Sequence, residues 1–228
     1  MADQVLSYLE MCQREGISLQ RGMNFQVRGG HSVVLMSLQP GAPYRDRRTD
    51  DGTVLLYEGH DAPRRHGAPD PKTVDQPGQV PGGRPTENGK FYAAAMSARH
   101  GLTPPDRVRV YEKLRAGVWA YNGLFHLMDA ALQHDGRRHV YVFRLELAPE
   151  EEPGDVQPRL TEPRRIIPTH VKVEVYQRDG GRCVVCGSTV NLHFDHVLPY
   201  AKGGSSDTAA NVQLLCATHN LAKGDRLQ

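Results

Sequence analysis

The sequence predicts an α+β protein, with a curved antiparallel sheet or open barrel and flanking helices followed by a small, metal-stabilised module. Two observations support this fold class. Between residues 25 and 147 the apolar runs are short, β-branched and interrupted by turns, and they do not alternate with helical patterns as βαβ units would. Three of the four cysteines lie in the last quarter of the chain, a distribution that indicates a metal site.

Hydrophobic periodicity predicts two helices in the first part of the chain. Residues 2–15 carry apolar side chains at helical spacing and stop before Gly16, and Thr86–His100 places Phe91 and three alanines on one side. Strands are expected where short apolar runs lie between turn residues. The expected strands are Ser32–Leu38, Thr53–Tyr57, Arg107–Leu114, Val118–Leu127 and His139–Leu147.

Two polar stretches divide the chain. Residues 60–85 are rich in Pro, Gly, Arg and Asp, and such a long loop inside a folded domain is expected to be either functional or disordered. Residues 148–168 contain repeated prolines and an acidic run, which predicts a semi-rigid linker. We therefore expect a first domain at 1–147, the linker at 148–168 and a second domain at 169–228.

Composition narrows the class of protein. A hydrophobic content of 39% with 24% charged residues is ordinary for a globular protein, and no apolar run approaches the ~18 residues that span a bilayer. The first residues lack a secretory signal, so a cytoplasmic protein without membrane contact is expected. The net charge of +2 does not by itself indicate nucleic-acid binding. Several arginine pairs permit phosphate contacts, although such pairs are more often ordinary solvated surface.

Four metal-binding side chains occur as two close pairs. Cys183-x-x-Cys186 is followed about thirty residues later by Cys216-x-x-His219. Tetrahedral zinc takes such sulfur and nitrogen ligands, and a module this small benefits from a metal ion because its core is limited. The pattern predicts structural Zn²⁺. The remaining cysteine, Cys12, is expected to be a small buried hydrophobe on the first helix.

Zinc does not account for the polar residues between these pairs. The order is Cys-x-x-Cys, Asp195-His196-x-x-Pro, Gly-Gly, Asn211-x-x-x-Leu-Cys and Asn220-x-x-Lys223. This pattern resembles the HNH nucleases of the ββα-metal fold and covers about residues 170–226. One position departs from the resemblance, since His219 stands where such modules usually have cysteine.

Phosphodiester hydrolysis needs a deprotonated water and a cation that absorbs charge at phosphorus. His196 has the basicity of a general base, and Asp195 with Asn220 offers oxygen ligands for Mg²⁺ or Mn²⁺. The resemblance implies that Asn211 braces the loop that orients His196, and Lys223 is a candidate phosphate contact. Since neighbouring residues of a regular strand point to opposite faces, Asp195 and His196 require a distortion or a strand end.

Three segments of the first domain carry a second resemblance. Ser32-Val-Val-Leu, Asp51-Gly-Thr-Val-Leu-Leu-Tyr57-Glu-Gly59 and Tyr121-Asn-Gly-Leu-Phe125, followed by Val142-Phe-Arg-Leu, are similar in order and spacing to the SRA domain. That family reads 5-methylcytosine, and the similarity covers about residues 20–147.

The SRA resemblance implies that the modified base is flipped out of the duplex and held between two aromatic rings. The corresponding rings are Tyr57 and Tyr44, and Asp46 would accept from the cytosine amino group. Glu58 replaces the threonine that the family has after its second aromatic residue, which places a negative charge near the pocket. The sequence leaves the choice between methyl and hydroxymethyl cytosine open.

Together these patterns predict a modification-dependent restriction endonuclease that acts on double-stranded DNA carrying modified cytosine. One HNH site cuts one strand at a time, so a double-strand break needs a homodimer or two independently bound chains, and a homodimer is expected. Two alternatives remain at this point. The chain could be an HNH nuclease without modification dependence, or a non-cutting DNA-binding protein with a zinc-ribbon tail.

Overall fold

The computed structural model describes residues 3–19, 21–28, 30–49, 52–148, 166–199 and 202–224. The strands in these ranges are β1 (Gln4–Leu6), β2 (Met23–Val27), β3 (His31–Met36), β4 (Arg47–Arg48), β5 (Val54–Glu58), β6 (Asp106–Arg115), β7 (Val118–His134), β8 (His139–Leu147), β9 (Leu192–His196) and β10 (Val212–Cys216). The helices are α1 (Tyr8–Glu15), α2 (Glu87–Arg99), α3 (Thr169–Arg178) and α4 (Ala217–Lys223), with 3-10 turns at Pro71–Thr73 and Ala209–Asn211.

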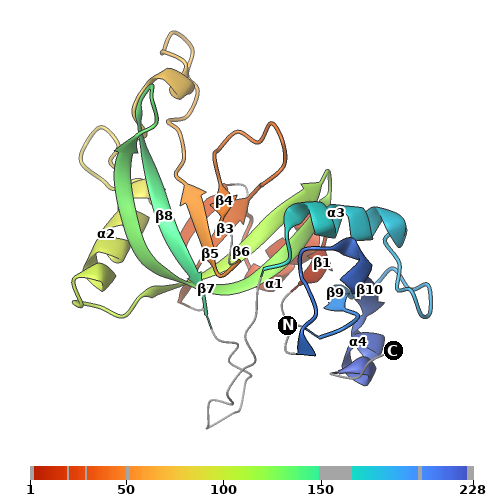
Figure 1. The fold of residues 1–228 in the computed structure, drawn as a ribbon. Helices are drawn as coiled ribbons and strands as arrows, with labels where there is room; N and C mark the ends of the chain where they lie inside the picture. The colour runs from red at the N-terminus through yellow and green to blue at the C-terminus, as the bar shows by residue number, and fades with distance from the viewer. Residues whose placement is uncertain are drawn as a thin grey trace.

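These strands form one curved, ten-stranded sheet, so the mixed α+β prediction is confirmed. Its main path runs β10-β9-β1-β7-β6-β3-β2, and β8, β5 and β4 extend from β7 as a second branch. The neighbours pair antiparallel except β3 and β6, which are parallel. The long strand β7 contacts both branches, and the sheet folds around it (Figure 1).

The start of the chain differs from the predicted helix over residues 2–15. The helix begins only at Tyr8, because Ser7 and Glu10 form a reciprocal capping box that fixes its first turn. The preceding residues Gln4–Leu6 are extended and pair with β7. The C-terminal end of this helix agrees with the prediction, since Gly16 ends α1 in the left-handed conformation with φ 65°.

Strand β1 joins the two parts of the molecule. It lies between β7 and β9, with Gln4 opposite Tyr121 on one side and His193 on the other. The N-terminus therefore lies beside the C-terminal module (Figure 1). Most of the expected linker, residues 149–165, falls outside the described residues. After it, Ile166 enters the main core while Ile167 enters the core of the C-terminal module.

A buried ion pair connects α3 to the sheet. The Lys172 ammonium lies 2.9 Å from a Glu112 carboxylate oxygen, which also accepts a 3.0 Å hydrogen bond from Asn122. Both charged side chains are fully buried. A buried pair of this kind is weak evidence for net stability, but removing one partner costs about 3–5 kcal/mol. The contact therefore holds α3 against β6 and β7 in one arrangement.

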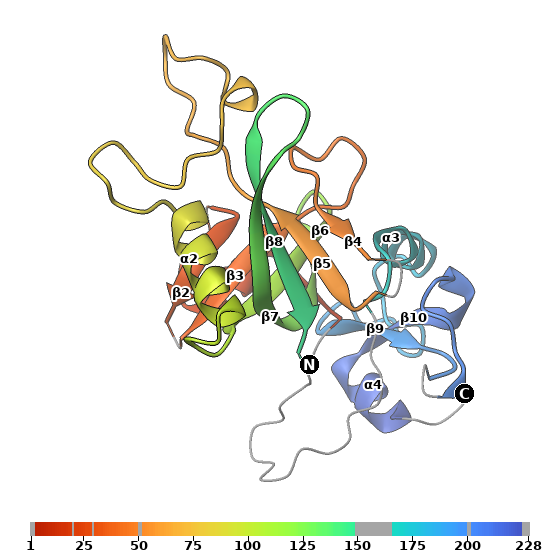
Figure 2. The same ribbon diagram turned by 60° about the vertical axis from the view of Figure 1, so that its left-hand side comes forward.

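Helix α2 covers one face of the sheet and helps to close the main core (Figure 2). Phe91 and Ala95 of this helix are buried against Phe143 and neighbouring strand residues. The polar loop expected over residues 60–85 extends away from the sheet, and Arg138 attaches it. This arginine is buried and ion-paired with Asp61 at 2.6 Å. No helix within the described residues is long and apolar enough to cross a membrane.

Candidate functional site

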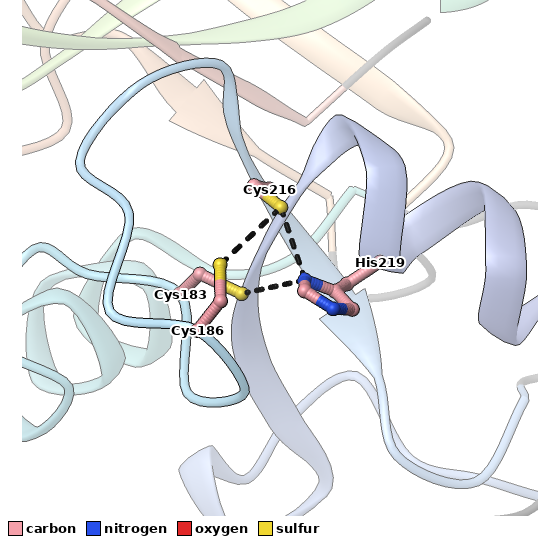
Figure 3. Close-up of side chains that lie close together, drawn as sticks. All are labelled: Cys183, Cys186, Cys216 and His219. Carbon is pink, nitrogen blue, oxygen red and sulfur yellow. Dashed lines mark hydrogen bonds between the residues drawn. The ribbon is translucent and has the colours of Figure 1, made fainter.

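The two metal-binding pairs come together in the C-terminal module. Cys183 and Cys186 lie in the loop after α3, while Cys216 and His219 lie where β10 passes into α4 (Figure 3). Their four ligand atoms all lie within 4.8 Å of one another. The grouping predicted from sequence spacing is therefore present in the folded chain.

The dimensions of this cluster fit a tetrahedral zinc ion. With Zn–S near 2.3 Å and Zn–N near 2.0 Å, ligand atoms should lie about 3.5–3.8 Å apart. The Cys186 and Cys216 sulfurs are 3.9 Å apart, and His219 Nδ1 lies 3.6 Å from the Cys183 sulfur. Although burial raises the pKa of the Cys183 thiol, hydrogen bonds from backbone N–H groups lower it to about 6, which favours the thiolate that zinc binds.

Strand β9 ends at the candidate general base. His196 is its last residue, which meets the requirement for a strand end, and Asp195 precedes it opposite Gln213 of β10. His196 Nε2 lies 2.9 Å from the Ser206 hydroxyl, and Ser206 is buried. The serine therefore fixes the orientation of the imidazole. It was not identified from the sequence, because nothing in the spacing places residue 206 at this ring.

The loop after His196 is held by the side chain of Asn211. Its amide oxygen accepts from the Leu198 backbone N–H at 2.8 Å, and its amide nitrogen donates to the carbonyls of Leu198 and Ser205 at 3.0 and 2.9 Å. Gly204 is required beside this brace, since a Cβ there would lie 1.9 Å from the Leu198 carbonyl oxygen. Asn211 therefore ties Leu198 to Ser205, and the orientation of His196 by this loop stays a prediction.

Lys223 lies inside the module in this structure. Its ammonium is 2.9 Å from Asp195 Oδ2 and donates to the His196 carbonyl at 2.6 Å, and its side chain is 1% exposed. Phosphate contact by Lys223 stays a prediction, whereas its contact with Asp195 is direct. Because Asn220 is three residues earlier on α4, it shares the helix face that carries Lys223 toward β9.

The order of these residues can be compared with known families. Residues 183–226 match the family model described as HNH endonuclease. The C-terminal segment is therefore similar to HNH endonucleases, and we call it the HNH module. This confirms the prediction made from its motif, and the matched range includes all four cluster residues together with Asp195, His196, Asn211 and Asn220.

Comparison with solved structures covers more of the chain than the HNH module. The SUVH5 SRA domain bound to fully hydroxymethylated CG DNA is 20% identical with a TM-score of 0.43, and covers 64% of this chain and 88% of that one. The complex of the same domain with hemi-methylated CG DNA is 19% identical with a TM-score of 0.44, and covers 67% of this chain and 90% of that one. The type IV phosphorothioation-dependent restriction endonuclease ScoMcrA is 15% identical with a TM-score of 0.43, and covers 97% of this chain and 55% of that one. No curated protein matches the chain.

A cavity of about 1120 Å³ lies between the first part of the sheet and α3 of the HNH module. Two of the predicted base-pocket residues, Tyr44 and Asp46, line it. The third, Tyr57, is only 1% exposed and lies in the main core, where its hydroxyl donates to the Gly22 carbonyl at 3.2 Å. The side chain next to Tyr57 that lines the cavity is His60, for which the sequence carries no motif signal.

Asp46 is held by two backbone donors. Its carboxylate accepts from the N–H groups of Glu58 at 2.9 Å and Ser37 at 3.3 Å. Burial raises the pKa of Asp46 to about 7, against the lowering effect of these two hydrogen bonds. The charge expected from Glu58 at the pocket is balanced, because Glu58 is buried and lies 3.5 Å from the Arg138 guanidinium.

Removal of the Ser206 hydroxyl should slow cutting. Ser206→Ala is expected to lower the single-turnover cleavage rate by about fivefold, since one hydrogen bond that orients His196 is worth about 1 kcal/mol. The affinity for DNA should not change. Ser205→Ala is the matched control, because its hydroxyl accepts only from the Asp207 backbone among the hydrogen bonds described for it. Equal rates for both variants would contradict a positioning role.

If the cavity takes up an extruded cytosine, the affinity for modified DNA should depend on the ionisation of Asp46. Only the carboxylate form leaves both oxygens as acceptors for an amino group. With a pKa of about 7, its fraction rises roughly tenfold between pH 6 and pH 8, and binding should strengthen accordingly. Fluorescence anisotropy with a modified duplex and no added divalent ion measures this. Asp46→Asn should remove this rise in affinity between pH 6 and pH 8. An affinity of the unaltered protein that does not change with pH would refute the prediction.

Proposed function

We propose that this chain is a DNA endonuclease that cuts when a modified cytosine occupies the cavity beside Tyr44 and Asp46. One observation supports the proposal most directly. The HNH module and the sheet that lines this cavity are continuous through β1, so a base-binding site and a cutting site belong to one body. A zinc-ribbon tail without catalysis would not require the Ser206–His196 and Lys223–Asp195 contacts.

The cutting chemistry is assigned to the HNH module. Ser206 orients the imidazole of His196, which takes the proton from the attacking water. Asp195 and Asn220 would hold one Mg²⁺-like ion, which when bound supplies charge stabilisation at the scissile phosphate and the leaving oxygen. Lys223 keeps Asp195 oriented. Zinc at the Cys183 cluster would stabilise the module and take no part in the reaction.

The reading chemistry is assigned to the cavity. The Tyr44 ring, which the His60 imidazole and the Lys72 ammonium contact in this structure, can stack on a base once one of these groups moves away, and such stacking is worth about 1–3 kcal/mol per base. The Asp46 carboxylate can accept from the exocyclic amino group of cytosine. Arg21, Lys113 and Arg115 also line the cavity and supply positive charge for the flanking phosphates. These groups suit an extruded nucleotide with its backbone.

Double-strand cleavage would need two copies of the HNH site. We propose that two chains act together, since each module attacks one strand. With circular DNA as the substrate, nicked circles at low protein concentration and a steep rise of linear DNA with protein concentration would support this arrangement. Linear product that stays proportional to protein at every concentration would count against it.

The test is a comparison of matched duplexes that differ only at one cytosine. Plain, 5-methyl and 5-hydroxymethyl versions are incubated with Mg²⁺ or Mn²⁺, and again with EDTA. The proposal expects cleavage of a modified duplex that requires the divalent ion. Cleavage of all duplexes alike would remove the modification dependence and keep the nuclease. Absence of cleavage with every ion would overturn the nuclease assignment.

A second candidate is an HNH nuclease without modification dependence. The burial of Tyr57 favours it, because a ring that is 1% exposed cannot stack on an incoming base without rearrangement. The same duplex comparison separates the two candidates. Under this alternative, Tyr44→Ala should reduce the binding of plain and modified DNA equally.

A further inference from the structure

We infer that His60 is the specificity-determining residue of the cavity, because its imidazole occupies the face of Tyr44 that an extruded base would need. This inference rests on the proposed base-reading function. His60 lines the cavity together with Tyr44 and Asp46. It therefore competes with the base for the same surface.

The contacts of the imidazole are those expected of a bound base. Its ring stacks on Tyr44 with centroids 5.1 Å apart and an angle of 11° between the planes. Its Nε2 lies 2.9 Å from the Tyr57 hydroxyl, and the two ring centroids are 6.1 Å apart. His60 thus contacts both rings that the sequence had assigned to the base. A base sandwiched between planar groups needs them about 7 Å apart, so none fits between Tyr44 and His60 at 5.1 Å.

The backbone of His60 is fixed, so entry of a base must come from movement of the side chain. The buried Asn88 side chain accepts from the His60 N–H and donates to its carbonyl, both at 2.8 Å. Gly59 is packed against the same asparagine, since a Cβ there would lie 2.7 Å from its amide oxygen. Rotation of the imidazole away from Tyr44 leaves these contacts intact.

The ring also packs closely over Gly22, where an added Cβ would lie 2.7 Å from two imidazole atoms. Burial lowers the pKa of His60 to about 4, although the charges of Asp61 and Glu87 raise it and that of Lys72 lowers it further. The ring is therefore neutral near pH 7 and stacks as an uncharged aromatic group. Displacing it costs the protein a stack and a hydrogen bond.

This cost sets a threshold for recognition. A base must gain more from Tyr44 and Asp46 than the imidazole loses, and a 5-methyl group adds apolar contact that plain cytosine lacks. The apparent affinity is reduced by the fraction of molecules in which the ring has left. Removing the ring therefore increases the affinity for the extruded base.

The experiment compares His60→Ala with His60→Phe in the full chain, using plain and 5-methylcytosine duplexes without added divalent ion. Alanine empties the space and should tighten binding of the modified duplex by about tenfold, whereas phenylalanine fills it and should not. Zinc content and melting temperature establish that each variant is folded. Weaker or unchanged binding by a folded alanine variant would overturn the inference.

A measurement on the unaltered protein does not depend on these variants folding. Imidazole resonances observed by ¹⁵N-histidine NMR should show His60 leaving its buried environment when the modified duplex is added, and remaining there with the plain duplex. A His60 signal that stays buried in both complexes would refute displacement. If the unaltered protein binds both duplexes equally, the base-reading function itself fails. If it discriminates between them but His60→Ala does not tighten binding, only the inference about His60 fails.

Discussion

His196→Ala is expected to reduce the DNA cleavage rate by about 10²–10⁴-fold, the range that a positioned general base contributes. His196 ends strand β9 and is oriented by Ser206, so its removal takes away the proton acceptor without opening the core. Zinc content and affinity for DNA should stay unchanged. Single-turnover cleavage at saturating protein, with binding measured separately, tests this expectation.

His134→Ala is the matched control for that substitution. This histidine is exposed at the end of β7, in the part of the sheet that branches away from the HNH module. Its replacement should leave the cleavage rate unchanged. If His196→Ala cut as fast as the His134 variant, the general base would have to be another group.

Cys183→Ser should remove zinc from the chain and abolish cutting. Cys183 is 2% exposed and belongs both to the ligand cluster and to the small apolar core of the module. In small zinc-finger peptides, zinc binding contributes an apparent free energy of about 10–16 kcal/mol to folding. The small apolar core of this module cannot replace a contribution of that size. Metal analysis should find less than one zinc per chain, and limited proteolysis should cleave within the HNH module.

Cys12→Ser provides the comparison, because Cys12 lies on α1, outside the cluster. Its hydrogen bond from the Leu19 backbone N–H is 3.4 Å long, and serine can retain it. This variant should bind zinc and cut normally. Full zinc occupancy and activity in Cys183→Ser would show that the cluster is not a structural metal site.

The HNH module could be predicted in detail because its chemistry is local in sequence. Paired cysteines, a glycine pair and spaced asparagines all lie within about sixty residues. The four predicted zinc ligands come together in the folded chain, and the Asn211 side chain contacts the loop after His196. The contact of Lys223 with Asp195 was not predicted, and its contact with phosphate stays a prediction. A long side chain reaches any acceptor within its radius, so the pairing with Asp195 depends on how α4 packs on β9.

The base pocket was harder to predict because it depends on contacts between distant loops. The sequence indicates an aromatic residue at 57, yet its burial follows from the side of β5 that faces the main core. His60 reaches Tyr44 only because Asn88, on a helix that begins 27 residues later, holds its backbone. The long-range pairing of β1 with β9 likewise has no local signal in a three-residue strand.

The shared sheet has a geometric consequence for DNA. Because β1 pairs with both β7 and β9, and Lys172 of α3 is buried against Glu112, the C-terminal module is held in a fixed position against the first part of the sheet. Under the proposed function, we expect incisions at a constant number of nucleotides from the modified base. A variant that separates Lys172 from Glu112 would then scatter the incision positions before it lost the ability to cut.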